Sequence, residues 1–245
     1  MKKVFFCLTF SVIFMISIGI AYAGQYPIPP VDPAFFTEPR DNTFFPMTAI
    51  GKTYVYEAET EDELVRSEVT FTTNTVDILG ISCIVVHDVE KVYIPDYDIW
   101  VITEDTFDWH AWDNDGNVWY FGEDTVACLS FDENWNCTES STEGSWKAGD
   151  DGATPGIIML ADPMPGISYR QEYYEDVAED MGKVLRLNAS VSVEYGDFDD
   201  CLKTKEWTTL SPGEIEHKYY APGVGLVFVE EHRGKTVRVE LVGID

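Results

Sequence analysis

Apolar and polar residues alternate with a period of two along most of this chain. The clearest example is residues 185–193, and residues 65–71 form a second. Successive side chains of a β-strand point to opposite faces of a sheet, so this alternation predicts strands with one apolar face. No window of about eleven residues carries the stripe of an amphipathic helix. The pattern therefore predicts an all-β protein.

Clusters of Gly, Pro, Asn and Asp separate the alternating segments, for example at residues 113–117, 211–213 and 221–223. These residue types favour tight turns, and long strands joined by tight turns form antiparallel hairpins. We expect about ten strands in one strongly curved antiparallel sheet, which closes as a barrel or remains open as a half-barrel. A sandwich of two sheets is the alternative.

The chain divides into an N-terminal lead-in and one domain. Residues 24–46 are rich in Pro and Phe, and repeated Pro excludes a regular helix or a central strand. We expect an extended segment whose Phe pairs pack on a single β domain at residues 47–245. Within that domain, residues 132–165 are rich in Gly, Pro, Asp and Ser, which predicts a long loop excursion from the sheet.

Residues 1–23 predict a secretory signal peptide. Two lysines open the segment, residues 4–20 are an almost uninterrupted apolar run, and Ala21 and Ala23 form a small-x-small cleavage site. Cleavage near Ala23 releases the protein into a periplasm or outside the cell. The alternative is a retained membrane anchor, which needs an apolar run of about 20 residues. We find no other stretch that predicts a membrane span.

The charge excludes one class of partner. The 245 residues include 16 Lys and Arg against 44 Asp and Glu, which gives a net charge of −28. Such a chain repels nucleic acid and anionic membranes. At 45% apolar and 14% aromatic residues, it is too hydrophobic for a disordered acidic tail.

Four cysteines remain after the signal peptide, an even number that suits disulfides in an oxidising compartment. Cys128 and Cys137 lie nine residues apart around Asp132, Glu133 and Asn134, a sequence typical of a loop tip, and predict a local bridge. That pairing leaves Cys83 to bond with Cys201. A metal or redox role is the alternative, but the chain has no C-x-x-C motif.

A family resemblance is carried by three stretches: residues 108–124 (DWHAWDNDGNVWYFGED), residues 144–180 (GSWKAG…PGIIM…YRQEYY) and residues 216–227 (EHKYYAPGVGLV). Together they resemble an uncharacterised family of exported bacterial all-β proteins. The last stretch is also similar to the closing hairpin of periplasmic proteins related to the half-barrel lipoprotein carriers. The resemblance implies an exported all-β fold and brings no catalytic residue with it.

Asp113, Asp115 and Asn117 are candidate calcium ligands, because spaced Asp and Asn side chains beside a turn glycine offer the oxygen atoms that Ca²⁺ prefers. The EF-hand pattern is incomplete, since Ala111 stands at its first ligand position and Gly122 at its final glutamate position. A hairpin turn is the alternative. We expect no resident cofactor, with Ca²⁺ as the candidate if an ion binds.

The candidate ligand-binding residues are Tyr169, Arg170, Glu172, Tyr174, Trp109 and Trp119. On a regular strand, Arg170, Glu172 and Tyr174 share a face, so the arginine can clamp a carboxylate while the tyrosine stacks on a ligand. An exposed ion pair between Arg170 and Glu172 is the alternative.

The histidines offer a second candidate metal site. His87, His110 and His217 lie on three different strand-like segments, each near an acid. If those strands are neighbours, the imidazoles can converge on Zn²⁺ or Cu²⁺. Separate, hydrogen-bonded histidines are the alternative.

The function that these features favour is a soluble, exported, non-enzymatic protein. The many strands and aromatic residues suggest that it binds or carries a small apolar or amphipathic ligand within the curved sheet. A structural or interaction protein of the cell envelope is the first alternative. A carboxylate-dependent hydrolase or metal-dependent protein is the second, although the chain has no G-x-S-x-G, H-E-x-x-H or P-loop motif.

Overall fold

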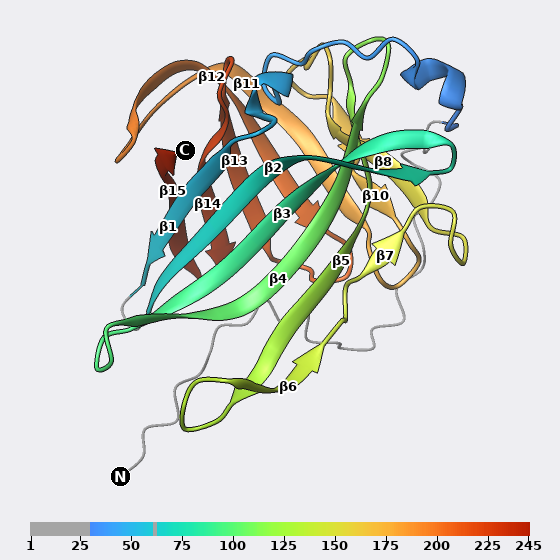
Figure 1. Ribbon diagram of the computed structural model, residues 1–245. Helices are drawn as coiled ribbons and strands as arrows, with labels where there is room; N and C mark the ends of the chain where they lie inside the picture. The colour runs from blue at the N-terminus through green and yellow to red at the C-terminus, as the bar shows by residue number, and fades with distance from the viewer. Residues whose placement is uncertain (1–29, 61–62) are drawn as a thin grey trace.

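β-Strands dominate the structure. The computed structural model describes residues 30–60 and 63–245, and its strands form one antiparallel sheet (Figure 1). The strands are β1 (Thr53–Glu59), β2 (Leu64–Ile78), β3 (Ile81–Ile94), β4 (Ile99–Trp112), β5 (Val118–Phe131), β6 (Cys137–Ser141), β7 (Trp146–Lys147), β8 (Thr154–Met159), β9 (Ser168–Arg170), β10 (Glu172–Tyr173), β11 (Asp180–Val193), β12 (Gly196–Thr208), β13 (Ile215–Ala221), β14 (Gly225–Arg233) and β15 (Lys235–Ile244). The two short 3-10 helices are η1 (Pro33–Phe36) and η2 (Met47–Ala49). The predicted all-β fold is confirmed, with fifteen strands in place of about ten.

The sheet is strongly curved, and its hydrogen-bonded order stays open. From one end to the other, the order is β10-β8-β5-β4-β3-β2-β1-β15-β14-β13-β12-β11-β9, and β6 and β7 also pair with β5. Figure 1 shows the long strands bending around a common interior. Of the two expected forms, the chain adopts the open, half-barrel-like one.

The two ends of this order belong to one short segment, residues 168–173. β9 pairs with β11 and places Arg170 opposite Met181, while β10 pairs with β8 and places Glu172 opposite Pro155. Between them, the backbone N–H of Gln171 donates to a carbonyl of β11 at 2.8 Å. This segment therefore ties the two ends of the curved sheet to each other.

The excursion at residues 132–165 returns to the sheet repeatedly. β6, β7 and β8 all pair with β5, and β8 also pairs with β10. These strands contain only 5, 2 and 6 residues. Runs this short carry too few positions for an alternation to be recognised, so the sequence predicted a loop here.

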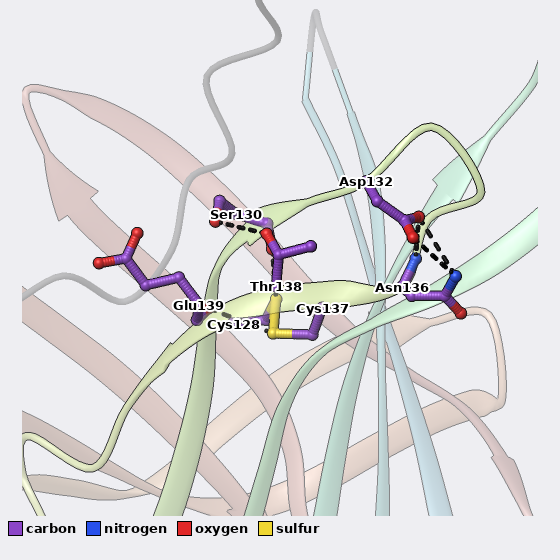
Figure 2. Close-up of a disulfide and its surroundings, with 7 residues drawn as sticks. All are labelled: Cys128, Ser130, Asp132, Asn136, Cys137, Thr138 and Glu139. Carbon is purple, nitrogen blue, oxygen red and sulfur yellow. Dashed lines mark hydrogen bonds between the residues drawn. A yellow bond between two sulfur atoms is a disulfide. The ribbon is translucent and has the colours of Figure 1, made fainter.

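The disulfide prediction is half confirmed. Cys128 of β5 and Cys137 of β6 form a disulfide across the hairpin that these strands make (Figure 2). Cys83 and Cys201 are free and buried, so the predicted bridge between them is wrong. Cys83 lies on β3 and Cys201 on β12, and five strands separate these two in the sheet order. Each thiol is buried in a different apolar cluster.

The lead-in packs on the sheet through its phenylalanines and crosses one end of it (Figure 1). The Phe36 ring meets Trp119 and Phe121 edge-on, with centroids 5.7 and 5.8 Å apart. The Phe45 ring lies 5.6 Å from that of Phe71 of β2. The predicted signal peptide and the first residues of the lead-in lie outside the described residues. Among the residues that are described, no helix has the length and apolar character to cross a bilayer.

Candidate functional site

Carboxylate side chains gather on one face of β3, β4 and β5. The pairing places Asp108 of β4 opposite Glu123 of β5, and Glu90 of β3 opposite Glu104 of β4. Asp88 is two residues from Glu90 on the same strand and therefore shares its face. We call these five residues the first wall.

The first wall lies on the inner, concave face of the sheet. Glu123 is close enough to Asp180 of β11 for the two carboxylates to repel each other electrostatically. Yet eight strands separate β5 from β11 in the hydrogen-bonded order. Residues 168–173 bring β5 and β11 together at the joined ends of the sheet. Glu90 of β3 is likewise close enough to Glu231 of β14 for electrostatic repulsion, although three strands lie between β3 and β14, so these two carboxylates face each other across the interior that the curved sheet encloses.

A second wall faces the first from β11, β12 and β13. The pairing places Glu206 of β12 opposite both Glu216 of β13 and Gly182 of β11, and Asp180 shares the face of Gly182. The Lys218 ammonium lies 2.9 Å from Glu206 and 3.2 Å from Glu216. We call Asp180, Glu206, Glu216 and Lys218 the second wall. Its single lysine is already paired with two carboxylates.

Glu172 of β10 lies between the two walls. Its side chain is buried, and both Asp180 and Glu123 act on it electrostatically. Trp146 of β7 stands opposite Glu123 in the pairing of β7 with β5, and its indole N–H favours the ionised form of Glu172. This N–H makes no hydrogen bond of ordinary length within the described chain.

Crowding raises the pKa of several of these acids. Burial is the largest cause in each case, and neighbouring carboxylates add to it. The pKa of Asp88 rises to about 8, that of Glu90 to about 7 and that of Asp108 to about 6. The pKa values of Glu123 and Glu172 lie well above the ordinary glutamate value for the same reasons. Near neutral pH, the inner face therefore holds protons that a bound cation can replace.

Hydroxyl groups position the carboxylates of both walls. The Tyr120 hydroxyl donates to Asp108 at 2.6 Å, and the Thr204 hydroxyl donates to Glu206 at 2.8 Å. Lys218 and Glu216 keep 25% and 23% of their side-chain surface exposed, so water reaches this face. The site is thus ordered and accessible.

Some buried polar atoms near the inner face have no hydrogen-bond partner within the described chain. They are Asp88 Oδ1 and His110 Nδ1, whereas Trp146 Nε1 and Gln171 Nε2 make only weak contacts with Glu172 and Glu206. Buried polar groups are normally hydrogen-bonded, so such atoms call for a bound water or ligand. Burial lowers the pKa of His110 to about 3, so its imidazole is neutral.

The six predicted ligand-binding residues divide between different surroundings. Tyr169 lies against Gly182 and Glu172 lies between the walls, so both belong to the inner face. Arg170 is buried, with its guanidinium 4.8 Å from the Tyr173 ring centroid, and no ion pair with Glu172 forms in the described structure. The alternative of an exposed pair is therefore wrong. Regular alternation fails because the segment changes partner strand at Gln171.

The remaining three candidates pack into an apolar cluster. Tyr174 and Trp109 are partly buried against it, and Trp119 is one of its buried members. Trp109 and Trp119 alternate with inner-face residues and therefore point to the outer face, which the lead-in covers. They do not join Tyr169 and Glu172.

Asp113 stabilises a hairpin turn between β4 and β5. One oxygen of its carboxylate accepts from the backbone N–H groups of Asp115, Gly116 and Asn117. The other accepts from the Asn117 amide and the Trp119 indole. These five donors satisfy the buried Asp113 carboxylate without a cation. Calcium binding at this turn stays a prediction.

The three predicted histidines do not converge. His87 stacks on Phe107 and hydrogen-bonds Asp105, while His110 stacks on Tyr120 at the inner face. His217 instead lies 3.1 Å from His232 of β14, nitrogen to nitrogen. The histidines are separate, as the alternative interpretation held, because His87 and His110 point to opposite faces of the neighbouring strands β3 and β4, while His217 lies on the distant β13.

An apolar groove of about 510 Å³ lies away from the inner face, near the disulfide hairpin. Its lining includes Trp100, Ile102, Val126, Phe131 and Trp135. The expected exposed apolar surface is therefore on the rim of the molecule, whereas the inner face of the sheet carries the two walls of carboxylates beside buried apolar residues.

Comparison with known proteins gives two distant structural likenesses. No family model and no curated protein matches the chain. A protein of Bacteroides fragilis NCTC 9343, inferred to be exported and with a YmcC-like fold, is 14% identical, with a TM-score of 0.40 over 86% of this chain and 99% of that one. An inferred lipoprotein of Parabacteroides distasonis ATCC 8503 is 13% identical, with a TM-score of 0.38 over 84% and 100% of the two chains. Scores this low assign neither fold nor function.

Proposed function

We propose that this chain is an exported, non-enzymatic binding protein that holds an amphipathic, positively charged ligand on the inner face of its sheet. The carrying observation is that two walls of carboxylates face each other, while the cations that pair with them in the described structure, Lys218 and Arg233, do so on the second wall. An amine that enters between the walls gains carboxylate partners and relieves their mutual repulsion. The export step rests on the basic and apolar character of residues 1–23.

The aromatic residues of the inner face supply the apolar half of the interaction. Tyr56, Tyr120, Tyr169 and Tyr220 are buried close to the acids, as their electrostatic contacts with Asp88, Asp108 and Glu206 attest. An aromatic face attracts a cation and also packs against a hydrocarbon chain. Tyrosines interleaved with carboxylates therefore favour an amphipathic amine over a purely apolar ligand.

The test uses two probes of equal chain length and opposite charge. Isothermal titration calorimetry below the micelle concentration should show binding of dodecylammonium and no comparable binding of dodecyl sulfate. Glu123→Gln should lower the affinity for dodecylammonium by about tenfold, which corresponds to about 1.4 kcal/mol of binding free energy.

Asp124→Asn is the matched control. Asp124 is the next residue on β5 and lies exposed on the opposite face, so both variants remove one negative charge from the same strand. Equal weakening by both variants, or equal affinity for both probes, would contradict a specific inner-face site.

A second candidate is an interaction protein of the cell envelope, and the apolar rim favours it. Ile102, Phe107, Val126 and Leu129 expose 50%, 40%, 44% and 48% of their surface on β4 and β5. Exposed apolar patches mark protein–protein contact sites. If neither probe binds, the result favours an interaction protein of the cell envelope.

A further inference from the structure

We propose that His217, His232 and Glu230 form a binding site for a divalent transition metal ion, with Zn²⁺ as the representative. The site lies on the β13–β14 hairpin. One ligand atom from each of the three residues lies within 4.8 Å of the other two. This inference does not depend on the proposed amine-binding function.

The register of the hairpin brings the three side chains together. His217 stands directly opposite Glu230, and His232 is two residues further along β14. Two residues apart on a strand means the same face, so all three share it. Lys218 and Glu216 of the inner face alternate with His217, which places the metal site on the outer face.

The distance between the imidazoles matches a metal centre. His217 Nδ1 and His232 Nε2 are 3.1 Å apart. With Zn–N bonds of about 2.0–2.1 Å, two ligands of a tetrahedral ion are separated by roughly 3.4 Å. A shift of a few tenths of an ångström, which side-chain rotation supplies, therefore admits the ion. A hydrogen bond between these nitrogens requires one ring proton, and moving that proton to the other nitrogen of the same ring frees both lone pairs for the ion.

Neighbouring groups orient the ligands. His232 Nδ1 lies 3.0 Å from the Thr236 hydroxyl, which fixes the ring with Nε2 toward His217. Glu230 Oε2 accepts from the Tyr219 hydroxyl at 2.9 Å and from Lys203 at 3.2 Å. Such partners fix the orientation of metal ligands. Lys203 also competes with the ion for Glu230, so the two imidazoles carry most of the coordination.

The donor set selects the ion. Two imidazole nitrogens and a carboxylate suit Zn²⁺, Cu²⁺ or Ni²⁺ better than Ca²⁺ or Mg²⁺, which prefer oxygen ligands alone. This preference separates the site from the carboxylates of the inner face, which offer oxygen only. Excess Ca²⁺ should therefore occupy the acids and leave the histidine site available.

The experiment is a Zn²⁺ titration by calorimetry in the presence of a large excess of Ca²⁺. Wild type should bind one Zn²⁺ per chain, and His232→Gln should weaken that affinity by at least roughly tenfold. His87→Gln is the matched control, because His87 is a partly exposed histidine on another strand, paired with Asp105. Circular dichroism should show that each variant is folded.

Two results would overturn the proposal. One is equal Zn²⁺ affinity in wild type and His232→Gln, and the other is loss of Zn²⁺ binding when Ca²⁺ is added. A second readout uses Cu²⁺: electron paramagnetic resonance should show two imidazole nitrogens bound in wild type and one in His217→Gln. If His232→Gln fails to fold, the His217→Gln spectrum decides the question.

Discussion

Gly156 marks the closest approach of two backbones near the candidate site. A Cβ atom at this position would lie 2.4 Å from the carbonyl carbon of Gln171 and 2.6 Å from the carbonyl oxygen of Arg170. Both are backbone atoms of the segment that ties the ends of the sheet together. The absence of one methyl group at Gly156 therefore lets β8 support the strand that carries Glu172.

Gly156→Ala should lower the free energy of unfolding by about 1–3 kcal/mol, because backbone atoms cannot move aside as the end of a side chain can. Urea denaturation followed by tryptophan fluorescence measures the change. Gly196→Ala is the control, since nothing lies within 4 Å of its added Cβ. Equal effects of the two substitutions would show that the close approach at Gly156 is unimportant.

At the scale of elements, the β5–β6 hairpin carries its own covalent link. The Cys128–Cys137 bridge spans nine residues. At the tip of the hairpin, the Asp132 carboxylate accepts from the Asn136 backbone N–H and side-chain amide, each at 2.9 Å (Figure 2). The hairpin also contributes Phe131 and Trp135 to the apolar groove. Its shape is thus held by local interactions.

Replacing both Cys128 and Cys137 by serine should cost about 2–3 kcal/mol, the loop-closure entropy expected for a ring of this size. Dithiothreitol should lower the melting temperature of the wild type and leave that of the double variant unchanged. A further drop in the reduced double variant would reveal a second disulfide and contradict the free state of Cys83 and Cys201.

The sequence predicted where the strands lie along the chain better than it predicted which strands pair with each other. The long strands follow from alternation, as residues 185–193 illustrate within β11. Their order does not, because hydrogen bonds between strands leave no mark on the period within a strand. Cys83 and Cys201 were paired by elimination, whereas Cys128 and Cys137 were paired by proximity along the chain. Only the pairing of Cys128 with Cys137 rests on a separation along the chain, which the sequence gives directly.

At the scale of the whole molecule, the chain has a net charge of −28, and part of its acidic residues gather on the inner face of the sheet. Acids from β3, β4, β5, β10, β11, β12 and β13 meet inside the curve of the sheet. The folded state therefore binds protons that the unfolded chain releases. For an acid with a raised folded pKa, stability is present at low pH and is lost as pH rises through that pKa.

Lowering the pH from about 8.5 to about 6.5 should raise the melting temperature. Asp88, with a pKa of about 8, and Glu90, with a pKa of about 7, take up protons in this window in the folded state only. Buried His110 opposes the effect only below the ordinary histidine pKa of 6.5. Differential scanning calorimetry measures the shift.

Asp88→Asn should make the rise in melting temperature smaller, because the variant no longer takes up that proton. Asp124→Asn, on the exposed outer face, should leave the rise unchanged. If the wild-type melting temperature instead falls as the pH is lowered from 8.5 to 6.5, the inner-face acids do not destabilise the fold by being ionised.

The candidate site was predictable only in part. Tyr169 and Glu172 were identified as ligand-binding residues and lie on the inner face. His232 was missed, although counting outward from the turn after Ala221 places it near His217. The paired walls gave no local signal, because a strand that carries an inner-face acid looks like any strand with a solvated face.

The sequence by itself determined the strands, the tight turns, the local disulfide and the acidic charge, since each depends on residues close together along the chain. Only the tertiary structure decided that the sheet stays open, that residues 168–173 join its ends and that the acids face inward. The physical reason is that alternation says a strand has two faces but not which one the curvature encloses. Curvature and strand order arise from contacts between distant segments, and here they turned a polar face into the interior.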